Sequence, residues 1–132
     1  MGTLTMMAAV AAGGAIGAIM RYSVSLVIGA GVFGISGPLA TLVVNIVGSA
    51  LMGFLASSIS VGLVLPEAWR GFLAVGMIGA LTTFSSFALD AGQLWQTKGI
   101  IMAGAYVLAS VVLSLAAFGM AFLAVRYSGV WQ

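Results

Sequence analysis

Residues 76–87 read Gly-Met-Ile-Gly-Ala-Leu-Thr-Thr-Phe-Ser-Ser-Phe, and this stretch decides how the rest of the chain is interpreted. It lies in a long apolar segment, yet its twelve positions hold two glycines, four hydroxyl side chains and two phenylalanines. Glycine destabilises a helix interior by about 1 kcal/mol relative to alanine, and serine and threonine compete for backbone hydrogen bonds. The stretch therefore predicts a break within a membrane-spanning helix. Irregular backbone at that depth must be buried in protein or line a cavity.

Composition places the whole chain in the membrane. Of 132 residues, 63% are hydrophobic and 5% are charged, with a mean hydropathy of +1.28, whereas a soluble domain has about 25% charged residues. Because one span needs about 20 apolar residues, the length suits four helices and no soluble domain. We predict an all-α integral membrane protein, one domain over residues 1–132, with spans at 5–31, 38–60, 70–94 and 99–125.

Charge and residue content exclude several functions. The net charge of +2 comes from four basic and two acidic residues that are too dispersed for a nucleic-acid partner. The chain has no cysteine and no histidine, which excludes disulfides, thiolate nucleophiles, catalytic triads and the usual zinc ligands. We expect no enzymatic activity. No basic residue precedes Arg21, so we also expect no cleaved signal peptide and a mature chain that begins at Met1.

The first segment carries Gly13, Gly17 and Arg21 at spacings of four, on one helix face. The glycines are typical of a surface where two helices approach closely. Arg21 has two interpretations, since an arginine in a span either snorkels to the interface or faces a wet cavity and attracts anions.

The second segment places Asn45 near mid-span, in a stripe of small and polar residues at spacings of four. Its amide must find partners inside the membrane, so it either joins two helices or lines a pore. Both interpretations stay open. The stripe consists of Thr41, Asn45, Ser49 and Gly53.

Aromatic and hydroxyl side chains mark the third and fourth segments. Phe84 and Phe87 share a helix face; aromatics at that spacing are commonly core or lipid-facing, but here hydroxyls surround them. Tyr106, Ser110 and Ser114 repeat every four residues, although serines can also bond inertly to their own helix. Amides, hydroxyls and ring edges are all donors or electropositive groups, and that inventory suits an anion.

Acidic residues fall near the expected span ends, Glu67 in the loop before the third segment and Asp90 close to its exit to water. Proton-coupled transport usually needs a carboxylate within the membrane, so this placement disfavours a proton-driven transporter. Basic residues are balanced, with Arg70 and Arg126 on the side of the N-terminus and Arg21 and Lys98 on the other. Without a positive-inside bias, we predict dual topology and an antiparallel homodimer.

The chain resembles the Fluc (CrcB) family of fluoride channels over essentially its whole length. The matching pieces are residues 13–18 followed by Arg21-Tyr22, residues 45–49 (Asn-Ile-Val-Gly-Ser), residues 79–87 (Gly-Ala-Leu-Thr-Thr-Phe-Ser-Ser-Phe), and Tyr106 with Ser110. The family often has glycine in place of Ala80 and threonine in place of Ser86. Both departures leave the chemistry of the motif intact.

The resemblance implies an antiparallel homodimer with two fluoride pathways and a structural sodium ion at the dimer axis. Asn45 would donate to the permeating ion, the ring edges of Phe84 and Phe87 would face it, and Arg21 would lie in a vestibule. The sodium would be held by the carbonyls of Gly79 and Thr82. Further fluoride contacts would come from hydroxyls, at Tyr106, Ser110, Ser114, Thr41 and Ser86.

The expected function is passive, fluoride-selective export, giving fluoride resistance. The protein would be multi-pass in the cell membrane, the inner one where a cell has two. One alternative is a small multidrug-type dual-topology antiporter, which needs a carboxylate in its first helix, and none precedes Glu67. The other is a non-transporting membrane assembly subunit, which leaves the donor stripes unexplained.

Overall fold

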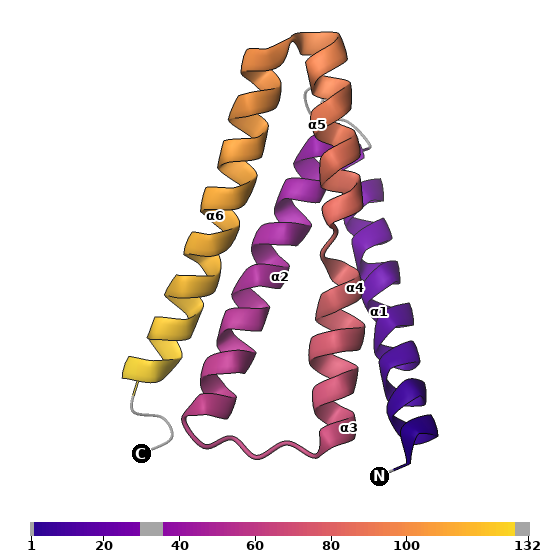
Figure 1. The fold of residues 1–132 in the computed structure, drawn as a ribbon, viewed down its shortest axis with the longest axis vertical. Helices are drawn as coiled ribbons and strands as arrows, with labels where there is room; N and C mark the ends of the chain where they lie inside the picture. The colour runs from indigo at the N-terminus through magenta and orange to yellow at the C-terminus, as the bar shows by residue number, and fades with distance from the viewer. Residues whose placement is uncertain (1, 30–35, 129–132) are drawn as a thin grey trace.

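The fold is built from four long helical stretches (Figure 1). A computed structural model describes residues 2–29 and 36–128, so most of the connection between the first two expected spans lies outside it. Within these ranges there is no strand, and four stretches are long and apolar enough to span a membrane, as predicted. The helices are α1 (Thr3–Gly29), α2 (Ser36–Ser60), α3 (Glu67–Arg70), the π-helix η1 (Gly71–Ile78), α4 (Gly79–Leu81), α5 (Phe84–Lys98) and α6 (Ile100–Tyr127).

The third stretch runs without a gap through α3, η1 and α4, stops at Leu81 and resumes at Phe84. The predicted break near the middle of the third helix is therefore present. The helix also continues to Lys98, past the expected end at 94. Its last residues are polar but remain helical. It ends at Gly99, whose φ of 88° suits glycine, and α6 begins at the next residue.

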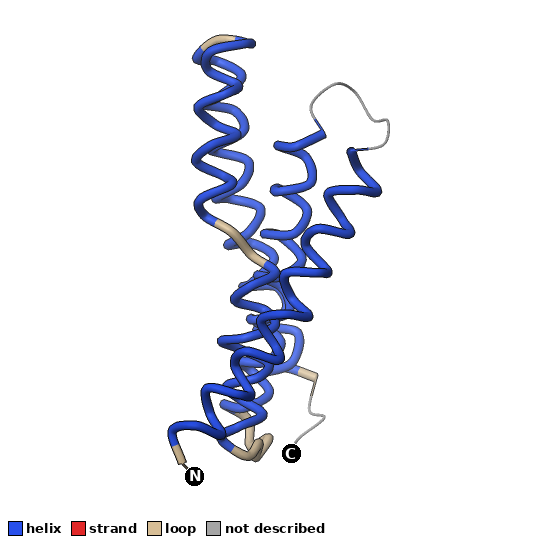
Figure 2. Tube along the Cα trace, turned by 90° about the vertical axis from the view of Figure 1, so that its right-hand side faces the viewer, coloured by secondary structure: helices blue, strands red, loops and turns tan. Residues whose placement is uncertain are grey.

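Two helix pairs make up most of the packing. α2 lies along α6, and α1 lies along η1 and α4, while α5 packs mainly on α6 (Figure 1). Figure 2 shows the break as a short non-helical segment about halfway along the elongated molecule. Most large apolar side chains point outward, among them Leu4, Ile101 and Leu108, as expected of helices that face lipid.

Glycines allow backbones to touch at both pairs. A methyl group at Gly13 or Gly17 would collide with the carbonyls of Phe72 and Met77 in η1, and one at Gly53 would collide with that of Phe118 in α6. The predicted close-packing face of the first helix is thus confirmed, with η1 as its partner. This contact fixes the lower half of the third span, residues 67–81, against α1.

Candidate functional site

The break consists of two extended residues, Thr82 (φ −79°, ψ 156°) and Thr83 (φ −152°, ψ 127°). Thr83 is the N-cap of α5, and its Oγ1 accepts a hydrogen bond from the Ser86 backbone N–H at 3.2 Å. Thr82 turns back to the preceding helix, where its Oγ1 donates to the carbonyl of Ile78, the last residue of η1, at 3.2 Å. The two threonines therefore finish one helix and start the next.

Asn45 holds the break through two hydrogen bonds. Its Nδ2 donates to the Thr83 carbonyl at 3.0 Å, and its Oδ1 accepts from the Thr83 backbone N–H at 2.8 Å. An extended residue has no helical partners for these two groups, so the amide supplies both. Asn45 thus joins α2 to the third span, and its second Nδ2 proton stays available as a donor. The structure is therefore compatible with both interpretations of Asn45, as a link between two helices and as a pore-lining donor.

Opposite electrostatic ends meet at this point. The C-terminus of α4 presents carbonyls without helical partners, and the N-terminus of α5 presents backbone N–H groups. The helix dipole makes the first end electronegative and the second electropositive. A broken helix at membrane depth can therefore favour a cation on one side and an anion on the other.

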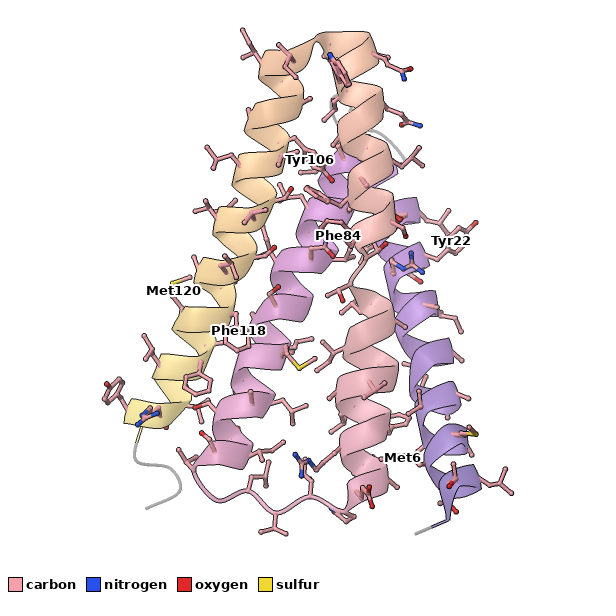
Figure 3. All side chains as sticks on the ribbon, in the orientation of Figure 1. Met6, Tyr22, Phe84, Tyr106, Phe118 and Met120 are labelled. Carbon is pink, nitrogen blue, oxygen red and sulfur yellow. The ribbon has the colours of Figure 1, made fainter. Side chains whose placement is uncertain are left out.

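A cavity of about 550 Å³ lies against the break, between α2, α5 and α6. It brings together five of the residues predicted for a fluoride pathway, Asn45, Phe84, Phe87, Ser110 and Ser114, with the two predicted sodium ligands, Gly79 and Thr82. Figure 3 shows Phe84 and Phe118 between the ribbons of these helices, whereas Tyr22 and Met120 point outward. Its other lining residues are Gly48, Ser49, Met52, Ile78, Thr83, Val111, Leu115 and Phe118.

The two phenylalanines of the motif have different environments. Phe84 is 79% exposed, whereas Phe87 is 9% exposed and packs with Leu94, Ala103 and Tyr106. Their ring centroids are 5.3 Å apart, and Phe87 lies 5.6 Å from the ring of Tyr106. Phe87 is therefore both a core residue and a cavity residue, and Phe84 is free to contact whatever enters the cavity.

Four predicted site residues lie outside the lining. Thr41 and Tyr106 are buried next to the cavity, between α2, α5 and α6. Ser86 uses its hydroxyl locally, where it accepts from Thr83 Oγ1 at 3.2 Å. Arg21 is half-buried on α1, with its Nε buried and without a hydrogen-bond partner among the described residues.

Asp90 corrects one expectation. The sequence placed it at the exit to water, but it is 7% exposed and lies mid-way along α5. Its Oδ2 accepts from the Tyr106 hydroxyl at 3.4 Å, and its Oδ1 is close to Gly37 in the first turn of α2, where the helix dipole favours a negative charge. The prediction was wrong because the helix extends beyond 94 and α2 and α6 cover this face.

Sequence reasoning missed several lining residues that had a readable signal. Ser49 was seen in the stripe of Asn45 but was not placed in the site, and Phe118 continues the spacing of four after Ser114. Thr83 is itself a residue type that helix N-caps prefer, at the point where the helix resumes. Met52 and Leu115 had no such signal, because apolar residues are unremarkable in a membrane helix.

Fold and site together define a class, namely a small multi-pass membrane protein with four spans and a broken third helix beside a donor-lined cavity. Residues 8–122 match the family described as CrcB-like protein, Camphor Resistance (CrcB). The chain belongs to this family, and the resemblance drawn from its motifs is confirmed.

Similar proteins with assigned names support this family membership. The chain is 45% identical over 113 residues to "Fluoride-specific ion channel FluC 1" of Nitrobacter hamburgensis, covering 86% of this chain and 89% of the relative. It is 41% identical over 121 residues to "Fluoride-specific ion channel FluC" of Photobacterium profundum, covering 89% and 91%. A protein of the same name from Vibrio campbellii is 39% identical over 126 residues, covering 92% and 95%. With four apolar spans, the chain is a multi-pass protein of the cell membrane.

Proposed function

We propose that this protein is a fluoride-selective channel that lets fluoride leave the cell passively. The observation that carries the proposal is the cavity at the helix break, which gathers an amide, three serine hydroxyls and three phenyl rings beside the N-terminus of α5. Fluoride is small and strongly hydrated, so its passage needs several close donors in sequence. The relatives that are named fluoride-specific ion channels support the same ion.

Within the pathway, each group acts by its own chemistry. Asn45 offers the Nδ2 proton that Thr83 does not use, and the α5 N-terminus adds backbone N–H groups. The edges of Phe84 and Phe87 carry the positive part of the ring quadrupole. Ser110 has a buried hydroxyl without a partner among the described residues, and Ser114 follows one turn later. Weak sites in series bind the ion and also release it.

Purified protein in liposomes tests the channel. Vesicles loaded with potassium fluoride should release fluoride when a potassium ionophore is added, and vesicles loaded with potassium chloride should retain chloride. A fluoride electrode and a chloride electrode measure the two rates. Equal release of both ions would contradict selectivity, and no release of either would contradict the channel.

The proposal extends to an antiparallel homodimer with two pathways. The cavity opens on the outer surface of one subunit, with Phe84 79% exposed on it, so a second copy would close it. α1 begins and α6 ends at the same side of the bundle, where α3 and the last turn of α6 carry Arg70 and Arg126, while α5 ends at the other side with Lys98 (Figure 1). Two reporters, each active on only one side of the membrane, should both be active when they are fused to the C-terminus. Activity of one reporter alone would mean a single orientation and would contradict dual topology.

A structural sodium ion at the dimer axis completes the proposal. The carbonyls of Gly79 and Thr82 belong to the last helical turn before the break and to the break itself, and hard cations prefer such oxygens. Gly79 also accepts a long bond of 3.4 Å from Thr82 Oγ1, which leaves a lone pair for a cation. Replacing sodium by a large organic cation during purification should reduce dimer stability, as measured by thermal unfolding. An unchanged midpoint would contradict the sodium site.

One observation favours a proton-coupled transporter, of a kind other than the small multidrug-type antiporter, whose carboxylate would lie in the first helix. Asp90 is a carboxylate buried within a span, and such groups often relay protons. A channel should release fluoride at the same rate whether or not a pH gradient is imposed across the liposomes. Fluoride movement driven uphill by the pH gradient would favour the transporter and contradict the channel.

A further inference from the structure

Thr82 lies in a notch of α2 that glycine creates. A methyl group at Gly48 would overlap the Cγ2 methyl of Thr82, whereas the next nearest atoms, Thr82 Cβ and Leu81 Cδ2, would be 3.7 Å and 3.8 Å away. The space at Gly48 is therefore filled by one methyl group of Thr82. Gly48 is buried, and it lies on α2 one turn after Asn45.

The position of this methyl group decides where the hydroxyl of Thr82 points. With Cγ2 in the notch, Oγ1 lies 3.2 Å from the Ile78 carbonyl and 3.4 Å from the Gly79 carbonyl, so its one proton is shared between the two. Threonine is stiff at χ1 because both heavy atoms branch from Cβ. Moving the methyl out of the notch would also move the hydroxyl away from the end of α4.

The other side of this segment is equally constrained. Gly17 of α1 lies against the Met77 carbonyl and the Leu81 backbone nitrogen, in the last turn before the break. Backbone contact on that side prevents the turn from yielding. One residue later, Asn45 holds Thr83 from the same helix as Gly48. Contacts on both sides thus hold Thr82 in one position.

We propose that Gly48 is a positioning residue for the break, and that it acts by accepting the Thr82 methyl group and so fixing the threonine rotamer and its carbonyl. The role rests on the proposed channel function for its effect on transport, but not for its effect on structure. It explains why glycine is needed at this place, although alanine is the better helix former.

The test is a rescue. Gly48→Ala should displace the break and reduce fluoride efflux from liposomes by about tenfold. A loss of this size corresponds to the free-energy cost of modest overpacking. Thr82→Ser removes Cγ2 and with it the contact that fixes the rotamer, so it should itself lower efflux, by about threefold. In the double variant the alanine methyl fills the space that Cγ2 leaves, so efflux should be several-fold higher than in Gly48→Ala and no lower than in Thr82→Ser. Gly14→Ala is the matched control, because no atom lies within 4 Å of a methyl there.

A second readout does not depend on transport. The chain has six threonines, so selective ¹³C-threonine labelling gives a spectrum in which Thr83 reports on the break and Thr97, in α5, serves as a reference. Gly48→Ala should shift the Thr83 signals, and Thr82→Ser should restore them. Thr97 should stay unchanged in all variants.

The outcomes separate the two proposals. If the Thr83 signals do not move in Gly48→Ala, or are not restored in the double variant, the positioning role is overturned. If Gly48→Ala does not assemble but the double variant does, the role is supported, and failure of both variants to assemble overturns it. Spectral rescue in a protein that releases no fluoride would contradict the channel and leave the positioning role standing.

Discussion

The two halves of the third span, 67–81 and 84–98, are equal in length but differ in how they are held. The lower half packs on α1 through backbone contact, and its buried residues are Gly71, Gly76, Ile78 and Leu81. The upper half packs on α6 through side chains, and its buried residues are Phe87, Asp90 and Leu94. Close backbone contact tolerates no added atoms, while side-chain packing can carry polar groups. One half therefore serves assembly, and the other can serve ion contacts.

This difference predicts a division of mutational effects. Added volume in the lower half should unfold the protein, and changed chemistry in the upper half or the break should alter transport in a folded protein. The largest expected effect lies at the contact between the lower half and α1.

Gly17→Ala should destabilise the protein by about 3 kcal/mol or more, because its methyl group would collide with the carbonyl of Met77, which cannot move away. The fraction of monodisperse protein that survives heating in detergent measures this. Gly14→Ala on the same helix meets no atom within 4 Å and should behave as the unmodified protein. Equal stability of the two variants would remove the backbone-contact argument for the lower half.

Asn45→Asp should lower fluoride efflux by about a hundredfold. The carboxylate cannot donate to the Thr83 carbonyl, and its charge repels an anion by several kcal/mol. Liposome efflux measures the loss. Gln93→Glu, an exposed site outside the cavity, makes the same charge change and should leave efflux unchanged. Normal efflux in Asn45→Asp would leave Asn45 as a purely structural link.

The two phenylalanines should separate within the upper half. Phe84→Ile should lower efflux by about tenfold with stability unchanged within about 0.5 kcal/mol, because the ring is 79% exposed. Phe87→Ile should lower efflux and also stability by about 1 kcal/mol, because that ring is in the core. Efflux and thermal unfolding together check the pair, and Phe54→Ile, outside the cavity, is the control. Loss of stability without loss of efflux at both sites would mean that both rings only pack.

The smallest effect is expected at Ser110. Ser110→Ala should reduce efflux by about threefold, the scale of a hydrogen bond within the membrane, without reducing stability. Stability should be kept because the hydroxyl is buried and has no partner among the described residues, so its loss removes no protein contact. Ser23→Ala, at an exposed serine that bonds to its own helix, controls for the substitution. A clear loss of stability at Ser110 would indicate a structural role instead.

Much of the site followed from local chemistry. The break at Thr82 and Thr83 was predictable because glycine and hydroxyl residues disfavour helix, and the shared cavity of Ser110 and Ser114 was predictable because residues four apart share a helix face. The buried place of Asp90 was not predictable, since a carboxylate near a run of polar residues reads as the end of a span. Its cover comes from α2 and α6, which are distant in sequence.

Sequence alone determined the four membrane helices, the position of the break and the donor character of the site, because hydropathy, helix propensity and side-chain chemistry are properties of single residues or short windows. Only the tertiary structure decided that Asn45 bonds to both sides of Thr83, that Gly48 receives the Thr82 methyl group, and that Thr41 and Tyr106 lie beside the cavity and not in its lining. Those facts depend on how α2 is rotated and shifted against the third span. That geometry is set by close packing over the whole bundle, and no short stretch of sequence contains it.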